Sequence, residues 1–195
     1  MIEKRYYAAY MKRYCMSKMD PIKSVDDIDK IKVYLQNDNK RNYLLFIIGI
    51  NTPLKSNRIL KLTFSHFLNE DYSLKDFIEL DNRKYRINNS IKTAFKDYWI
   101  DDNYDLSDYI FESNKKNEPI DRSHLYRILN DTIKVCNLSL NIGNETLRKT
   151  YGYHYYYKTK DVNYLKQVFN KSSNKLLFDY LGIDDISERY DDFCL

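Results

Sequence analysis

The run Leu44 to Ile50 (LLFIIGI) is the longest apolar stretch of the chain, and it constrains the fold more than any other feature. A helix that is apolar on every side has to be buried on every side. Asn42 to Ile50 is therefore expected to form a core helix, which Asn51-Thr52-Pro53 ends because proline cannot continue a helix. The run is far shorter than the roughly 20 apolar residues that cross a bilayer, so no membrane partner is expected.

Helical patterns account for most of the remaining chain. Ser24 is expected to cap a helix that runs to about Gln36, with Asp26 and Asp27 in its first turn, where the helix dipole favours acidic side chains. Further helices are expected over residues 2–18, 54–62, 89–100, 121–137, 144–158, 161–169, 173–181 and 184–193.

A hairpin-like signal interrupts this helical series. Residues 74–80 (LKDFIEL) and 84–87 (KYRI) flank Asp81-Asn82-Arg83, a combination that is typical of a tight turn between two strands. The sequence therefore predicts a mainly α fold with a small antiparallel β-sheet. With 195 residues, four glycines, three prolines and no repeat or linker, one compact domain is expected.

Charge is distributed unevenly along the chain. Residues 1–63 carry a net charge of +7, residues 64–119 carry −4 and residues 120–195 carry +1. The N-terminal third is therefore the best candidate for contact with phosphates, although a solvated helical face explains its charge equally well. Three cysteines without metal-ligand spacing indicate reduced thiols and a cytoplasmic protein of a bacterium or phage.

Three segments occur in an order that resembles a known family. RNYLLFIIGINTPLKSNRILKL (41–62), GNETLRKTYGYHYYYKTKDVNYLKQVFNKSS (143–173) and SSNKLLFDYLGI (172–183) resemble boxes I and II and the nucleophile helix of the tyrosine recombinases, the phage-integrase family, in their compact Gram-positive or phage form. The resemblance implies the fold of the catalytic domain over residues 21–195. Residues 1–20 would add a basic helix, without a separate core-binding domain.

The resemblance also implies a metal-independent chemistry without cofactors. A tyrosine attacks a DNA phosphate, two arginines hold its nonbridging oxygens, a hairpin lysine protonates the leaving 5′ oxygen, and two further groups assist. By register, Tyr180 is the nucleophile and Arg148 one of the two arginines.

Four of these six family positions differ in this chain. Lys55 stands at the first arginine, Glu145 at the histidine before Leu-Arg, and Lys171 at the second histidine. The hairpin is short, and Lys84 is the nearest substitute for its lysine. Lysine keeps the charge of arginine but loses the planar fork that holds a phosphate by two hydrogen bonds.

The function expected from this pattern is double-stranded DNA binding with impaired catalysis, in a regulator of a phage or mobile element or in a recombination accessory. The residues expected to contact DNA are Arg148, Lys149, Lys55, Lys171 and Lys84. An active recombinase that uses Tyr180 is the enzyme alternative, and a protein-interaction module on the same fold is a third. The C-terminal helix at 184–193 is a candidate homo-oligomer contact or packs on its own domain.

Overall fold

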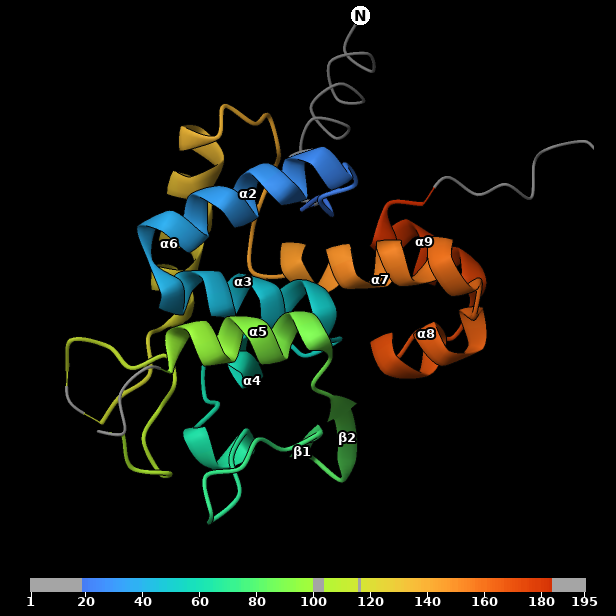
Figure 1. The fold of residues 1–195 in the computed structure, drawn as a ribbon. Helices are drawn as coiled ribbons and strands as arrows, with labels where there is room; N and C mark the ends of the chain where they lie inside the picture. Colours follow the sequence, from blue (N-terminus) through green and yellow to red (C-terminus); the bar gives the residue numbers. More distant parts are fainter. Residues whose placement is uncertain (1–18, 100–103, 116, 184–195) are drawn as a thin grey trace, which may run out of the picture.

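The computed structural model describes residues 19–99, 104–115 and 117–183 of the chain. Within these ranges the protein is mainly helical and has one antiparallel sheet of two strands, which confirms the predicted fold class (Figure 1). The helices predicted over 2–18 and 184–193 lie outside the described residues. The oligomer contact predicted through the second of them therefore remains a prediction.

Helix α3 (Lys40–Asn51) lies at the centre of the main core, as its apolar sequence predicts. The side chains from Leu44 to Ile48 are each 1% exposed or less. Helices α2 (Val25–Asp38), α5 (Asn89–Tyr98) and α7 (Thr146–Thr159) all pack against it (Figure 1). Burial on every side explains why this helix carries no polar face.

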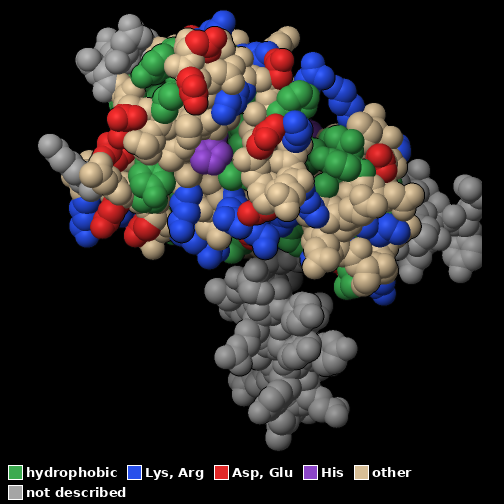
Figure 2. Space-filling view, turned by 90° about the horizontal axis from the view of Figure 1, so that it is seen from below, with side chains coloured by type: hydrophobic (Ala, Val, Ile, Leu, Met, Phe, Trp, Pro, Cys, Tyr) green, Lys and Arg blue, Asp and Glu red, His purple; other side chains and the backbone are tan. Residues whose placement is uncertain are grey.

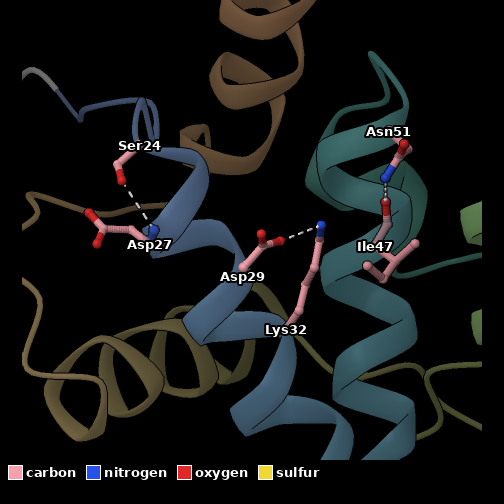
Figure 3. A network of polar contacts seen from close by, with 6 residues as sticks. All are labelled: Ser24, Asp27, Asp29, Lys32, Ile47 and Asn51. Atoms are coloured by element: carbon pink, nitrogen blue, oxygen red, sulfur yellow. Dashed lines mark hydrogen bonds and ion pairs between the residues drawn. The ribbon is translucent and has the colours of Figure 1, made fainter.

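Helix α2 begins where the sequence predicts. The Ser24 side chain accepts a hydrogen bond from the Asp27 backbone nitrogen at 3.1 Å, which satisfies one of the free donors of the first turn. An ion pair between Asp29 and Lys32 follows on its surface, while Asn51 closes α3 by donating to the Ile47 carbonyl (Figure 3). Helix α6 (Arg122–Val135) packs against α2.

The helix predicted over 54–62 is shorter than expected. Only Ser56–Ile59, helix α4, is α-helical, and Leu60 and Lys61 follow as a turn. The chain then forms a 3-10 turn, η1 (Phe64–His66). Burial of Leu60 and Leu62 explains the helix-like apolar spacing, because both side chains enter the main core without a continuous helix.

The predicted hairpin is present, with a turn one residue shorter than its sequence signal. Strands β1 (Phe77–Leu80) and β2 (Arg83–Arg86) pair in antiparallel register, with Leu80 opposite Arg83. Asp81 and Asn82 form the turn, with φ angles of 51° and 59°. Aspartate and asparagine tolerate this left-handed region better than most residues, and a two-residue hairpin turn requires it. Arg83 therefore belongs to the strand.

A second, smaller core joins α7 to α8 (Val162–Phe169) and α9 (Asn174–Leu181). Figure 1 shows this part on the right, beyond the end of the central helices. Gly152 makes the close packing possible, since a Cβ atom there would lie 2.5 Å from Leu181 Cδ2 and 2.8 Å from the Phe169 ring. This contact sets the distance between α7 and α9, and so between Arg148 and Tyr180.

Candidate functional site

A polar cavity of about 910 Å³ lies where the two cores meet. Its wall comes from the segment after α3, from α4, the hairpin, the first residues of α6 and α7, and the connection from α8 to α9. Its lining residues are Pro53, Leu54, Lys55, Ser56, Asn57, Arg58, Asp81, Arg83, Tyr85, Arg122, Glu145, Arg148, Gln167, Val168, Phe169, Asn170, Lys171 and Tyr180. Six of them are Lys or Arg and two are acidic, so the cavity suits an anion.

Arg148 is held in place by both cores. Its Nε donates to the Pro53 carbonyl at 2.6 Å and its Nη2 donates to the Val168 carbonyl at 3.0 Å. The guanidinium also lies 4.6 Å from the centre of the Phe169 ring. With 11% of its side chain exposed, Arg148 is fixed in orientation, and Nη1 is the nitrogen without a carbonyl acceptor. That nitrogen lies 3.8 Å from Glu145 Oε2.

Tyr180 approaches the same carboxylate from α9. Its hydroxyl donates to Glu145 Oε2 at 2.7 Å, and its ring lies 4.4 Å from Lys171 Nζ. Burial, and then the hydrogen bond and negative charge of Glu145, raise the pKa of Tyr180 well above its ordinary value, against a smaller opposite effect of Arg148. This arrangement therefore disfavours loss of the hydroxyl proton, which attack by the tyrosine on phosphorus requires.

Comparison with known proteins places this geometry in a family. A probable integrase/recombinase of Bacillus subtilis (strain 168), YoeC, is 38% identical over 175 residues, which are 89% of this chain and 95% of that protein. The chain belongs to the tyrosine recombinase family. No family model matches the sequence.

Solved structures of tyrosine recombinases share the fold. XerA recombinase matches with a TM-score of 0.66 and 18% identity, over 87% of this chain and 61% of its own. XerH, bound to its difH substrate after cleavage, matches at 0.61 and 18%, over 87% of this chain and 51% of its own. The Tn1549 transposon integrase, in complex with circular intermediate DNA, matches with a TM-score of 0.61 and 15% identity, over 82% of this chain and 60% of its own. The chain thus spans about half to three fifths of these recombinases.

The family positions that differ in sequence all line the cavity except the hairpin lysine. Lys55 precedes α4 with its side chain exposed, and Glu145 precedes α7. Lys171 follows Asn170, which ends α8 in the left-handed region with φ 52°. The structure therefore brings Lys55, Glu145 and Lys171 together with Arg148 and Tyr180, the two residues predicted to keep the identities of the family's catalytic positions.

Lys84 and Lys149 lie elsewhere. Lys84 is exposed on β2, where its ammonium pairs with Glu79 at 2.7 Å, and it is not part of the cavity wall. Lys149 is 6% exposed and donates to the Met19 carbonyl at 2.7 Å. Its Nζ lies 5.0 Å from the centre of the Tyr180 ring. A buried ammonium cannot reach the DNA backbone, so this position weighs against the direct DNA contact predicted for Lys149.

Three arginines of the cavity were missed by the sequence prediction. Arg58 pairs with Asp81 of the hairpin turn at 2.9 Å, and Arg83 and Arg122 are exposed at the rim. Arg58 stands three residues after Lys55, which is a helical spacing and the one signal available. Figure 2, a view from below, shows Lys and Arg side chains gathered toward the middle of the face.

The described ranges contain no group of three or more His, Cys, Asp or Glu side chains placed to hold a metal ion. In the same ranges, no helix combines the length and apolar character needed to cross a bilayer.

Proposed function

We propose that this chain binds double-stranded DNA by holding a backbone phosphate in the cavity around Arg148, and that strand cleavage by Tyr180 is inefficient. The observation that carries the proposal is the shared contact of Arg148 and Tyr180 with a carboxylate, Glu145. The cavity has the charge that a phosphate requires, while the nucleophile faces an anion. XerH and the Tn1549 integrase, which share the fold, are described in complexes with DNA.

The cationic side chains of the cavity have different parts in the proposed binding. Arg148 Nη1 would donate to a nonbridging phosphate oxygen, because Nε and Nη2 are already engaged by carbonyls. Lys55 and Lys171 would add positive charge without the paired donors of a guanidinium. Arg83 and Arg122, exposed at the rim, would contact neighbouring phosphates.

Catalysis needs more than this set provides. Removing one preorganised donor from such a site lowers the rate by about 10²–10³. Here Lys55 stands at the position predicted for the first arginine, and the hairpin contributes Asp81, Arg83 and Tyr85 to the described cavity wall instead of a lysine that could protonate the leaving 5′ oxygen. The losses need not multiply, but together they favour a binding protein over a strand transferase.

A DNA-binding recombinase fold with weak cleavage is suited to regulating a phage or mobile element, or to assisting an active recombinase at its site. The enzyme alternative is favoured by one specific observation. The Tyr180 hydroxyl and Arg148 Nη1 both lie within 3.8 Å of a single oxygen, so they converge on one position as a tyrosine recombinase requires. A protein-interaction module is the remaining alternative, and no described contact favours it over DNA.

DNA binding is tested by selecting the genomic fragments that the protein binds at low and at moderate salt. The same experiment identifies the binding site. Because few phosphates are neutralised, we expect modest affinity with a slope of log K against log salt of roughly −3 to −5. Absence of binding to any fragment at low salt would contradict the proposal and favour the interaction module.

A further inference from the structure

One oxygen atom, Glu145 Oε2, occupies the centre of the retained site. It accepts the hydrogen bond from the Tyr180 hydroxyl at 2.7 Å, and it lies 3.8 Å from Arg148 Nη1. Both groups on which the proposed function depends are therefore directed at the same negatively charged atom of the protein.

Arg148 has little freedom to serve another anion elsewhere. Its Nε and Nη2 donate to the carbonyls of Pro53, in the segment after α3, and of Val168, in α8. The ring of Phe169 covers one face of the guanidinium. A phosphate can therefore approach Arg148 from the side of Nη1, where Glu145 now lies.

Tyr180 restricts the phosphate to the same position. To attack phosphorus, its hydroxyl oxygen has to lie beside the phosphate instead of donating to a carboxylate. A phosphodiester placed between Tyr180 and Arg148 would overlap the position of Glu145 Oε2 and would meet its negative charge. Glu145 in this orientation and a bound phosphate are mutually exclusive.

We propose that Glu145 is an internal competitor for the phosphate position, an autoinhibitory contact that holds the site closed until DNA displaces it. The inference rests on the proposed function and adds its regulation. A carboxylate carries the charge of a phosphodiester and accepts the same hydrogen bonds, so it mimics the ligand that Arg148 would otherwise take. The two cations around the Tyr180 ring, Lys149 and Lys171, favour an anion at this place.

Glu145 is able to leave this position without unfolding α7. Its side chain is 32% exposed, so a change of rotamer can move the carboxylate into solvent. It precedes the helix but makes no capping hydrogen bond with its side chain. At the helix start it is instead the Thr146 hydroxyl that takes part in a hydrogen bond, which it accepts from the Gly143 backbone nitrogen at 2.9 Å.

The test compares Glu145→Gln with the unaltered chain, using duplex DNA from the bound fragments and inorganic phosphate as separate probes. Glutamine keeps an acceptor for the Tyr180 hydroxyl and removes the charge. Glu70→Gln is the matched control, because Glu70 is an exposed acid outside the cavity wall and changes the net charge equally. Glu145→Ala repeats the test without the acceptor, and thermal unfolding of each variant verifies the fold.

We expect Glu145→Gln to bind both probes about tenfold more tightly than the unaltered chain, as removal of a like charge a few ångströms away predicts. Glu70→Gln should change each affinity less than twofold. If Glu145→Gln gains affinity for phosphate while no form of the protein binds DNA, the result supports competition by Glu145 and contradicts the proposed DNA binding.

Three results overturn the inference. If DNA binds the unaltered chain and Glu145→Gln equally well, or binds the variant more weakly, Glu145 does not compete, although the DNA function stands. If neither probe binds either protein, both proposals fall. Loss of a Tyr180–DNA adduct in Glu145→Gln without a gain in affinity would instead identify Glu145 as the acceptor of the tyrosine proton.

Discussion

At the scale of single residues, Arg148 has two tasks that are usually separate. It offers Nη1 to the cavity, and through Nε and Nη2 it connects the segment after α3 to the end of α8. The second task makes Arg148 part of the structure as well as of the site. Removing it leaves two carbonyls without the donor that they now have, which costs free energy when such groups are buried.

Arg148→Ala should therefore lower both stability and DNA affinity. We expect a loss of about 2 kcal/mol in the free energy of unfolding, measured by urea titration, because charge-assisted hydrogen bonds of this kind contribute about 1.5–3 kcal/mol. Arg127→Ala, at an exposed position of α6 outside the cavity, is the control for lost charge. Equal stability of the two variants would show that the carbonyl contacts of Arg148 contribute nothing.

The residues of the site were only partly predictable. Arg148 and Tyr180 follow from register within family segments, because the spacing from Leu-Arg to the nucleophile helix is readable along the chain. The Arg58–Asp81 pair was not, because its members are 23 residues apart and meet only after the hairpin folds against α4. The contact between Glu145 and Tyr180, 35 residues apart, likewise depends on how closely α9 packs on α7.

At the scale of elements, helix starts were the most predictable feature. Helices α2, α6, α8 and α9 each begin after a residue whose side-chain oxygen accepts a hydrogen bond from the first turn: Ser24, Asp121, Asp161 and Ser173. Such a cap depends only on nearby residues, so it can be recognised in the sequence. The helix predicted over 54–62 is too long, because its extent depends on residues far away in the sequence. Its apolar residues enter the core from a turn, and tertiary packing rather than helix propensity decides their place.

Gly152→Ala tests the close packing of α9 on α7. A Cβ atom at this position would lie 2.5 Å from Leu181 Cδ2 and 2.8 Å from the Phe169 ring, so these buried side chains or the helices that carry them have to shift. We expect a destabilisation of about 1–3 kcal/mol, typical of overpacking, despite the better helix propensity of alanine. Lys158→Ala, at an exposed position of α7, is the control. A Gly152→Ala protein as stable as the control would contradict the contact.

At the scale of the whole molecule, half-buried tyrosines are found beside both cores. Tyr98 donates to the Ile110 carbonyl in the main core, while Tyr151 and Tyr164 share a hydrogen bond beside the smaller one. Burial raises the pKa of Tyr98, Tyr151 and Tyr180, with Tyr104, Tyr164 and Glu145 as the respective next causes. Most of the tyrosines in the described ranges thus lie half-buried at the edges of the two cores, and the composition alone did not tell which ones.

These raised pKa values predict a loss of stability at alkaline pH. The folded state keeps the three phenolic protons more tightly than the unfolded state, whose tyrosines have a pKa of about 10. The contribution is therefore complete below about pH 10 and is lost as pH rises above it. Urea unfolding at several pH values, with tyrosinate absorbance, measures the decline. Tyr151→Phe should make the decline less steep, and an unchanged decline would contradict the role of burial.

We propose that the chain keeps the phosphate cavity of a tyrosine recombinase and cleaves DNA strands inefficiently. A suicide DNA substrate built from the selected binding site, which traps any covalent protein–DNA intermediate, tests this most directly. Tyr180→Phe is the control, and an active tyrosine recombinase on its own site gives the reference rate. We predict binding of the substrate with no Tyr180-dependent adduct above a small fraction of that rate. A Tyr180-dependent adduct that forms at a rate comparable to the reference would contradict the claim and identify the chain as an active strand transferase.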